Sequence, residues 1–506
     1  MTKRELLHAS SPSQSDWKQQ AAWSEDGYFQ LETADTGDVV VRLFVTQALL
    51  NEAEPTLYRQ VINATRFPGA KLVAITPDVH YGYGVPVGCV ILTDRAEGAV
   101  AMGPVGFDIG CGMMSAQSNV SAELATPDRK LEFNTEVMRR VSLGAGGKSV
   151  KLGALTESEF EDLVRGGAEH YVDTYGADFD RSRTERHRIP VSDAWEIPWG
   201  GKGKPERGLD QLGSLGGGNH FIELQRCEET GTLFVQVHTG SRGFGHGLAT
   251  NYFQMANEER PEDITDIDLG YFTPESKHHG EYLDAVAAGG NFAILNRLVI
   301  FEQIQAAFRK VFKEELELVY EISHNLVQAE DHPEFGEVWV HRKGATRAFP
   351  AGHPTLVGTM WESTGHPVLI PGSNRDYSYI LRPEAGAVKS GYSVNHGAGR
   401  RMSRGEALRQ LDQRKVDEQY RRDSILVNLD GRVPLDESNA CYKSSEEVVA
   451  AVVAAGLARV EHTLWPVASI KGNEERAATA KHRERKGRDR SREKERDAAR
   501  RTKGHY

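Results

Sequence analysis

The chain has 506 residues, a formal net charge of −11, 39% hydrophobic residues and 26% charged residues. This length and composition describe a soluble globular protein with one large core or two domains. No window approaches about 18 consecutive apolar residues, which argues against a transmembrane helix. The start, MTKRELLHASSPSQSDW, lacks an apolar core followed by a cleavage site, which argues against secretion. We therefore expect a cytoplasmic protein without a membrane partner.

Short runs rich in β-branched residues predict strands at 39–45, 71–76, 89–93, 232–239 and 316–323. Several runs lead into a polar or histidine-bearing turn, as in AITPDVHYGYG and FVQVHTGSRGFG. Strand ends of this kind let a rigid sheet present a site. Apolar residues at helical spacing over 297–316 predict a surface helix with one buried face. Mixed elements without a repeat indicate an α+β fold.

Three parts of the chain stand apart from this pattern. Residues 1–34 are expected to be an N-terminal extension, and residues 150–210 an insertion or a loosely packed helical lobe. Residues 481–506 carry 12 Lys and Arg against 5 Asp and Glu, a net charge of +7, which leaves −18 for residues 1–480. The tail, 474–506, is therefore expected to be disordered or a solvated helix. It serves either as a solubiliser or as a contact for RNA or a partner.

The four cysteines are widely separated and form no CxxC pair: Cys89, Cys111, Cys227 and Cys441. Disulfides would not persist in a reducing compartment, so each cysteine is a core residue, a bystander or a metal ligand. Cys111 lies three residues after Asp108 in GFDIGCG, a turn too rich in glycine for a helix. The other three cysteines are expected to be core or surface residues.

Five potential metal ligands lie at strand ends or in glycine-lined turns: Asp108, Cys111, His220, His238 and His324. Thiolate and imidazole ligands favour zinc or another late divalent ion, whereas a carboxylate favours manganese or magnesium. The set fits a two-metal centre with one bridging ligand at least as well as one structural zinc. Spacing alone does not establish convergence, because a single histidine of this kind is more often a core or loop residue.

The segment YSVNHGAGRRMSRGEA places His396 before Gly-Ala-Gly and three arginines, Arg400, Arg401 and Arg404. Glycines let the backbone approach a ligand closely, and arginines match phosphate oxygens. A histidine in this setting could be a nucleophile toward phosphorus. The alternative is a turn followed by a helix with basic residues.

Nine blocks together resemble the RtcB family of RNA ligases: PDVHYGYGVPVGCV, GPVGFDIGCGMMS, GSLGGGNHFIEL, VQVHTGSRGFG, EISHN, HRKGATRAFP, PGSNRDYSYIL, NHGAGRRMSR and WPVASIKG. They follow the family's order over roughly residues 35–472. The resemblance implies mixed sheets with surrounding helices around one central metal and nucleotide cleft, in a catalytic domain over 35–473. It implies an enzyme that uses GTP and two Mn²⁺ ions to join RNA 2′,3′-cyclic phosphate or 3′-phosphate ends to 5′-hydroxyl ends. The resemblance implies a role in RNA repair or tRNA splicing, and it leaves open whether the enzyme needs an activating protein partner.

The resemblance also implies residue roles. Two manganese ions would be held by Asp108, Cys111, His220, His238 and His324, with Cys111 as the bridge. His396 would become guanylylated before an RNA-3′-pp-5′-G intermediate forms. The nucleotide contacts would be Asn219, Glu223, Ser373, Gly397, Ala398, Gly399 and Lys471. Three further residues are expected either behind the site or on RNA phosphates: Asp78, Arg242 and Arg400.

Two features depart from the family pattern. The chain has PGSNRD where the family usually has PGSMG, so Asn374, Arg375 and Asp376 could change base selectivity. The charged tail after Lys471 is also unusual. Two alternative functions are a metal-dependent RNA cyclic phosphodiesterase without ligation and a catalytically inactive RNA-binding relative. Neither needs the complete set of residues, yet all five ligands, His396 and Lys471 are present.

Overall fold

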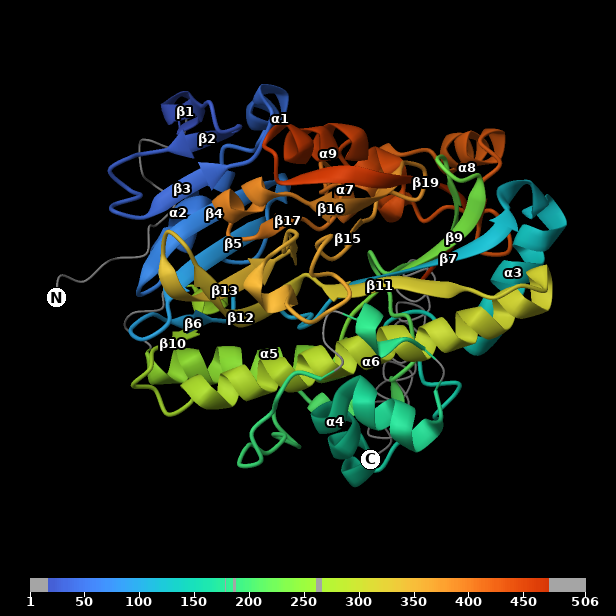
Figure 1. The fold of residues 1–506 in the computed structure, drawn as a ribbon, viewed down its shortest axis with the longest axis horizontal. Coiled ribbons are helices and arrows are strands. Elements are labelled where there is room, and N and C mark those ends of the chain that lie inside the picture. The colour runs from blue at the N-terminus through green and yellow to red at the C-terminus, as the bar shows by residue number, and fades with distance from the viewer. Residues whose placement is uncertain (1–16, 178, 185–187, 261–265, 473–506) are drawn as a thin grey trace, which may run out of the picture.

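The computed structural model describes residues 17–177, 179–184, 188–260 and 266–472. Within these ranges, nineteen strands form two large mixed sheets and two small ones, and nine α-helices pack around them (Figure 1). The α+β fold expected from the sequence is confirmed. The expected basic tail, 474–506, lies outside the described residues.

The seven-stranded sheet combines the N-terminal strands with one later hairpin. Its order is β1-β2-β3-β4-β5-β13-β12. All neighbours are antiparallel except β3 and β4, which are parallel. The strands are β1 (Ala21–Ser24), β2 (Tyr28–Leu31), β3 (Val40–Leu43), β4 (Ala70–His80), β5 (Val87–Asp94), β12 (Asn325–His332) and β13 (Gly336–Lys343). β1 and β2 come from the stretch expected to be an N-terminal extension.

The eight-stranded sheet has the order β11-β7-β9-β8-β19-β16-β15, and β18 pairs with β19 in parallel. Its strands are β7 (Gly112–Ser121), β8 (Phe221–Cys227), β9 (Thr232–Thr239), β11 (Glu317–Ser323), β15 (Val368–Ile370), β16 (Ser378–Pro383), β18 (Leu426–Val427) and β19 (Ala458–Lys471). Two small sheets pair β6 (Val100–Ala101) with β10 (Tyr271–Phe272) and β14 (Ala345–Arg347) with β17 (Ser393–Asn395). All five predicted strands are present, and β9 has its predicted bounds.

The helices are α1 (Gln47–Glu52), α2 (Leu57–Thr65), α3 (Pro127–Arg140), α4 (Glu157–Tyr175), α5 (Arg242–Glu259), α6 (His279–Phe312), α7 (Arg404–Gln410), α8 (Gln413–Arg422) and α9 (Ser445–Ala454). The short 3-10 helices are η2 (Trp17–Gln20), η3 (Ala122–Leu124), η4 (Arg181–Arg183), η5 (Pro205–Asp210), η6 (Ile267–Leu269), η7 (Pro354–Leu356), η8 (Ala385–Ser390), η9 (Leu435–Glu437) and η10 (Asn439–Cys441). α4 occupies part of 150–210, begins with a capping box at Thr156 and Glu159, and buries Phe160 and Leu163.

The helix predicted over 297–316 is present, but it begins earlier and its central part is buried on every face. α6 runs from His279 to Phe312, and every residue from 285 to 301 is buried. α6 crosses beneath β11 and lies between the sheet and α4 (Figure 1). α6 is long and apolar enough to cross a membrane by length and composition, but 89% of its apolar window is buried inside the protein. The predicted solvent face is present at Arg309 and Lys310, which are exposed, but Arg297 is fully buried, and the sequence does not reveal this covering layer.

Alternation along β9 separates an apolar face from a polar one. Leu233, Val235 and Val237 join the core shared with α5 and α6. Because successive side chains of a strand point to opposite faces, Gln236 and His238 project from the other face. The candidate ligand on β9 therefore faces away from the helices.

The two large sheets meet at His324. β11 is an edge strand of the eight-stranded sheet and ends at Ser323, whereas β12 is an edge strand of the seven-stranded sheet and begins at Asn325. His324 is thus the single residue between them. The junction brings ligands from one sheet close to residues supported by the other.

Candidate metal centre and active site

The five predicted metal ligands converge in the structure. Asp108 and Cys111 come from the loop before β7, His220 directly precedes β8, His238 lies near the end of β9, and His324 joins β11 to β12. Cys111 belongs to two groups, one with His238 and His324 and one with Asp108 and His220. Within each group the ligand atoms lie within 4.8 Å of one another. Cys111 therefore occupies the position of a shared ligand.

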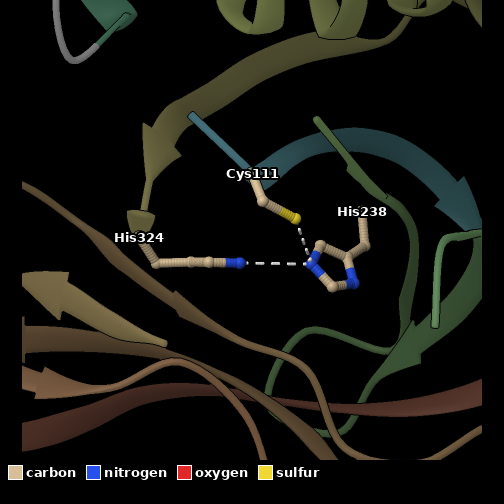
Figure 2. Close-up of side chains that lie close together, drawn as sticks. All are labelled: Cys111, His238 and His324. Carbon is tan, nitrogen blue, oxygen red and sulfur yellow. Dashed lines mark hydrogen bonds between the residues drawn. The ribbon is translucent and has the colours of Figure 1, made fainter. Parts of the chain in front are cut away.

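Short contacts join the ligand atoms into one cluster. Cys111 Sγ lies 3.2 Å from His238 Nε2 and 3.5 Å from His220 Nε2. His238 Nε2 also lies 3.2 Å from His324 Nε2. Figure 2 shows the side chains of Cys111 and His324 both pointing at the ring of His238. On the other side, His220 Nε2 lies 3.0 Å from Asp108 Oδ2.

The backbone orients two of the imidazoles. His220 Nδ1 donates to the carbonyl of Leu215 at 3.0 Å, and His238 Nδ1 donates to the carbonyl of Asn219 at 3.2 Å. A proton held on Nδ1 leaves the lone pair on Nε2, which is the atom that faces the cluster. The fold thus presets both rings for binding a cation.

The electrostatics of the cluster also fit a cation. Burial, together with the neighbouring imidazoles, lowers the pKa of His238 and His324 well below the usual range. Both rings are therefore neutral and can offer a lone pair to a metal ion. Burial and the nearby Asp108 carboxylate raise the pKa of Cys111, and a bound metal would remove that proton. Burial opposes the charge of Asp108, but His220 lowers the pKa of this carboxyl to about 2.

Arg297 of α6 ties the ligand loops together from behind. Its Nη1 donates to the carbonyls of Gly110 and Thr239, each at 2.8 Å, and its Nη2 donates to Ser323 Oγ at 2.8 Å. These three residues each neighbour a candidate ligand. Arg297 is fully buried and forms an ion pair with the equally buried Glu321. Sequence reasoning missed this residue because it treated Arg297 as part of a solvent face.

Gly240 shows how closely the loops approach. A Cβ atom at this position would lie 2.3 Å from Asp108 Oδ1, so any larger residue would displace the carboxylate. The glycine in HTGSRG is therefore required by the position of Asp108.

His396 follows β17 and lies beside the metal cluster. Its Nδ1 donates to Asp78 Oδ2 at 2.7 Å, and its ring centroid is 4.8 Å from that of His324. Asp78 is fully buried on β4 and also accepts the backbone N–H groups of His396 and Gly397, both at 3.2 Å. The bond to Asp78 holds the proton on Nδ1 and leaves the lone pair on Nε2.

A cavity of about 320 Å³ joins His396 to the cluster. Its lining includes Asp108, Cys111, Asn219, His324 and His396. Lys343 and Tyr83 also line this cavity and were not predicted as site residues, although Lys343 belongs to the block HRKGATRAFP. Burial lowers the pKa of Lys343 to about 8, and Tyr83 is 68% exposed at the cavity.

The remaining predicted nucleotide residues lie outside the lining of this cavity. Glu223 accepts from Gln225 Nε2 at 2.8 Å, and the same amide donates to Ser378 Oγ at 3.1 Å. Ser378 in turn accepts the backbone N–H of Gly372, next to Ser373, at 3.0 Å. Gly397 approaches this loop, since a Cβ on it would lie 3.5 Å from the Pro371 carbonyl oxygen. Ala398 is buried, and Gly399 packs so closely that a Cβ would meet the Asp78 carbonyl oxygen at 2.0 Å.

Glu437 organises a second group of charged residues that sequence reasoning missed. This buried carboxylate lies 3.5 Å from Lys471 Nζ, 3.3 Å from Arg400 Nη1 and 2.8 Å from Arg404 Nη2. Burial opposes its charge, yet Lys471, Arg404 and Arg400 lower the pKa of Glu437 below the usual value. Arg400 is thus held by the η9 segment, and its Nη2 also donates to the Asp436 carbonyl at 2.7 Å.

Arg242 lies at the start of α5, near the ligand loops. Its Nε donates to Ser214 Oγ at 3.2 Å and its Nη2 to the Gly144 carbonyl at 2.9 Å. It also contributes to the low pKa of Asp108. The structure therefore places Arg242 beside the cluster, whereas Arg400 belongs to the group around Glu437.

The three residues of the PGSNRD departure are fixed by contacts with later elements. Asn374 accepts a hydrogen bond from Tyr420 of α8, and Arg375 Nε pairs with Asp423 at 2.5 Å. Asp376 Oδ2 accepts the backbone N–H of Ser445 at 2.9 Å, at the start of α9. The departure thus anchors this loop to α8 and α9.

The sequence model of the family described as tRNA-splicing ligase RtcB matches residues 60–472. The chain belongs to the RtcB family. It is 35% identical to the tRNA-splicing ligase RtcB of Pyrobaculum aerophilum over 86% of this chain and 95% of that protein. It is likewise 35% identical to the tRNA-splicing ligase RtcB of Thermococcus kodakarensis, over 82% and 90%. An RNA-splicing ligase RtcB homolog 1 of Entamoeba dispar is 32% identical over 83% and 82%. The RtcB match spans all five clustered ligands and His396.

Proposed function

We propose that this RtcB protein is an RNA ligase that uses GTP and joins an RNA 2′,3′-cyclic phosphate or 3′-phosphate end to a 5′-hydroxyl end. The observation that carries the proposal is that His396, which pairs with Asp78, lines one cavity together with Cys111 and His324. The printed names of the relatives support an RNA ligase role. The natural RNA belongs to repair or tRNA splicing.

The ligand set favours two Mn²⁺ ions that share Cys111. One ion would use Cys111, His238 and His324, and the other Asp108, Cys111 and His220. Carboxylate, imidazole and thiolate together suit manganese or a later divalent ion. Bound metal would supply charge neutralisation at phosphate oxygens and a template for the reacting groups.

The chemistry proposed for His396 starts from its orientation. The lone pair on Nε2 attacks the α-phosphorus of GTP, the N–P bond forms, and the bond from the α-phosphorus to the bridging oxygen breaks to release pyrophosphate. The ring then carries a positive charge, which the carboxylate of Asp78 offsets through Nδ1–H. Asp78 thus acts as a positioning residue that also stabilises the charged ring.

Transfer to RNA completes the proposed reaction. A cyclic phosphate end is first hydrolysed to a 3′-phosphate. An oxygen of the 3′-phosphate then attacks the α-phosphorus and breaks the bond to His396, which gives RNA-3′-pp-5′-G. The 5′-hydroxyl attacks the RNA phosphorus, a phosphodiester forms and GMP leaves. Tyr83, exposed at the cavity, provides an aromatic surface on which a base of the RNA can stack.

Incubation with α-labelled GTP tests the proposal. The wild-type protein should become covalently labelled, and His396→Ala should lose the label without losing its fold. His353→Ala is a matched control, because this half-exposed histidine is the N-cap of η7 and does not line the cavity. Opening of cyclic phosphates without labelling would favour a phosphodiesterase, and RNA binding with neither activity would favour an inactive relative. Labelling of His396→Ala at wild-type yield would contradict the assignment.

Two further parts of the proposal concern the setting of the reaction. All four cysteines are free thiols, which agrees with a reducing compartment and a cytoplasmic protein. An activating protein partner would be detected as a factor that raises labelling or turnover of the purified chain.

A further inference from the structure

A third group of side chains of the types that bind metals lies at the other end of β8 from His220. It consists of Cys227, the last residue of β8, Glu229 in the following turn, and His462 on β19. Cys227 is buried, as expected of a core residue, and β19 brings His462 to it. With seven residues at about 3.3 Å each, β8 separates this group from His220 by roughly 20 Å.

The distances within the group suit a tetrahedral ion. Cys227 Sγ lies 3.2 Å from Glu229 Oε2 and 3.6 Å from His462 Nδ1. His462 Nδ1 lies 4.0 Å from Glu229 Oε2. A zinc ion with bonds of about 2.3 Å to sulfur and about 2.0–2.1 Å to nitrogen and oxygen requires spacings of roughly 3.3–3.6 Å. Shifts of about half an ångström would complete the geometry.

Neighbouring groups already hold the three ligands. Burial raises the pKa of Cys227, but the backbone N–H and hydroxyl of Thr230 lower it by hydrogen bonding to the sulfur. The backbone N–H of Thr463 donates to both oxygens of Glu229, at 3.0 and 2.9 Å. The ring of His462 packs 5.5 Å from that of Phe234. Such supporting contacts are typical of ligands in metal sites.

We infer that Cys227, Glu229 and His462 form a second metal site, which takes one Zn²⁺ ion. Cys227 is buried, His462 is half-buried and Glu229 is exposed, so the fourth coordination position opens to water. The ion pins the turn between β8 and β9 to β19. Thiolate with imidazole and one carboxylate is a donor set that zinc favours.

Cobalt absorption of the full-length protein tests the site. Co²⁺ replaces Zn²⁺ and gives an intense near-ultraviolet charge-transfer band only when a thiolate binds it. Cys111→Ser removes the other thiolate that lies among ligands. In that background the band should persist, vanish with Cys227→Ser and survive with Cys441→Ser, another buried cysteine. Absence of the band from Cys111→Ser, or its survival in the Cys227→Ser double variant, would overturn the inference.

A second measurement avoids substitution of a buried residue. Calorimetric titration with Zn²⁺ in the Cys111→Ser background should show a site whose affinity His462→Ala lowers. The loss should exceed the roughly 10- to 100-fold that removal of an outer hydrogen-bond partner costs. Glu228→Gln is the control, because Glu228 points to Arg226 rather than to Cys227. Equal Zn²⁺ affinities for the His462→Ala and Glu228→Gln variants would contradict the inference and show that the three residues are hydrogen-bonded but bind no metal.

Discussion

The metal cluster and the residues assigned to the nucleotide are held in different ways. Cys111, His220 and His238 contact each other directly, and Arg297 binds the loops behind them. Glu223 and Lys471 are instead held by separate partners, Gln225 and Glu437. Loss of one residue from the directly contacting cluster should therefore disrupt the whole cluster, whereas loss of Glu223 or Lys471 should remove that contact alone.

The largest expected effect comes from the centre of the cluster. Cys111→Ser should lose Mn²⁺ after dialysis and reduce GTP labelling below detection, because a serine hydroxyl seldom ionises enough to replace a bridging thiolate. Metal content and labelling are measured together. Cys89→Ser and Cys441→Ser are controls, since both cysteines are buried away from the cluster. Normal metal content and labelling in Cys111→Ser would reduce Cys111 to a packing residue.

Asp78→Asn tests whether the two sides can be separated. The neutral amide no longer offsets the charged ring or holds the same tautomer of His396, so the rate of labelling should fall by about 10²–10⁴-fold. Metal content should stay at the wild-type level, because Asp78 contacts none of the five clustered ligands through its side-chain bonds to His396 and Thr76. Loss of metal together with labelling would show that Asp78 supports the whole cleft.

Arg297→Met probes the support behind the cluster. It removes the buried guanidinium that pairs with the buried carboxylate of Glu321, and breaking such a pair should cost about 3–5 kcal/mol of unfolding free energy. Urea denaturation measures this loss, and metal affinity should fall with it. Arg226→Met is the matched control, because its ion pair with Glu228 is exposed and worth about 1 kcal/mol at most. Equal stability losses would contradict the role assigned to Arg297.

The sequence predicted ligand identities better than it predicted how the protein holds them. GFDIGCG and three histidine-bearing turns pointed to a metal site through residue type, and strand ends supplied the location. Convergence required the fold, because His324 reaches the cluster only through the junction of two sheets. Arg297 was missed since its partners lie at distant strand ends. Glu437 was missed because no motif distinguishes a buried carboxylate from an exposed one.

The smallest expected effect concerns Glu223 and sharpens the comparison through pH. Burial raises the pKa of Glu223 from 4.5 to about 7, although Gln225 and Lys471 act in the opposite direction. Between about pH 4.5 and pH 7, Glu223 keeps its proton in the folded protein but has lost it in the unfolded chain. Stability from this group is therefore present below pH 4.5 and is lost as pH rises through about 7, by up to about 3 kcal/mol. Glu223→Gln should remove this part of the pH dependence, as measured by denaturation at about pH 5 and about pH 8. Glu228→Gln, an exposed neighbour, should keep it. Identical pH profiles for wild type and Glu223→Gln would mean that Glu223 is charged in the folded protein. The fold would then stabilise the charged carboxylate of Glu223 as it stabilises that of Asp108 in the cluster.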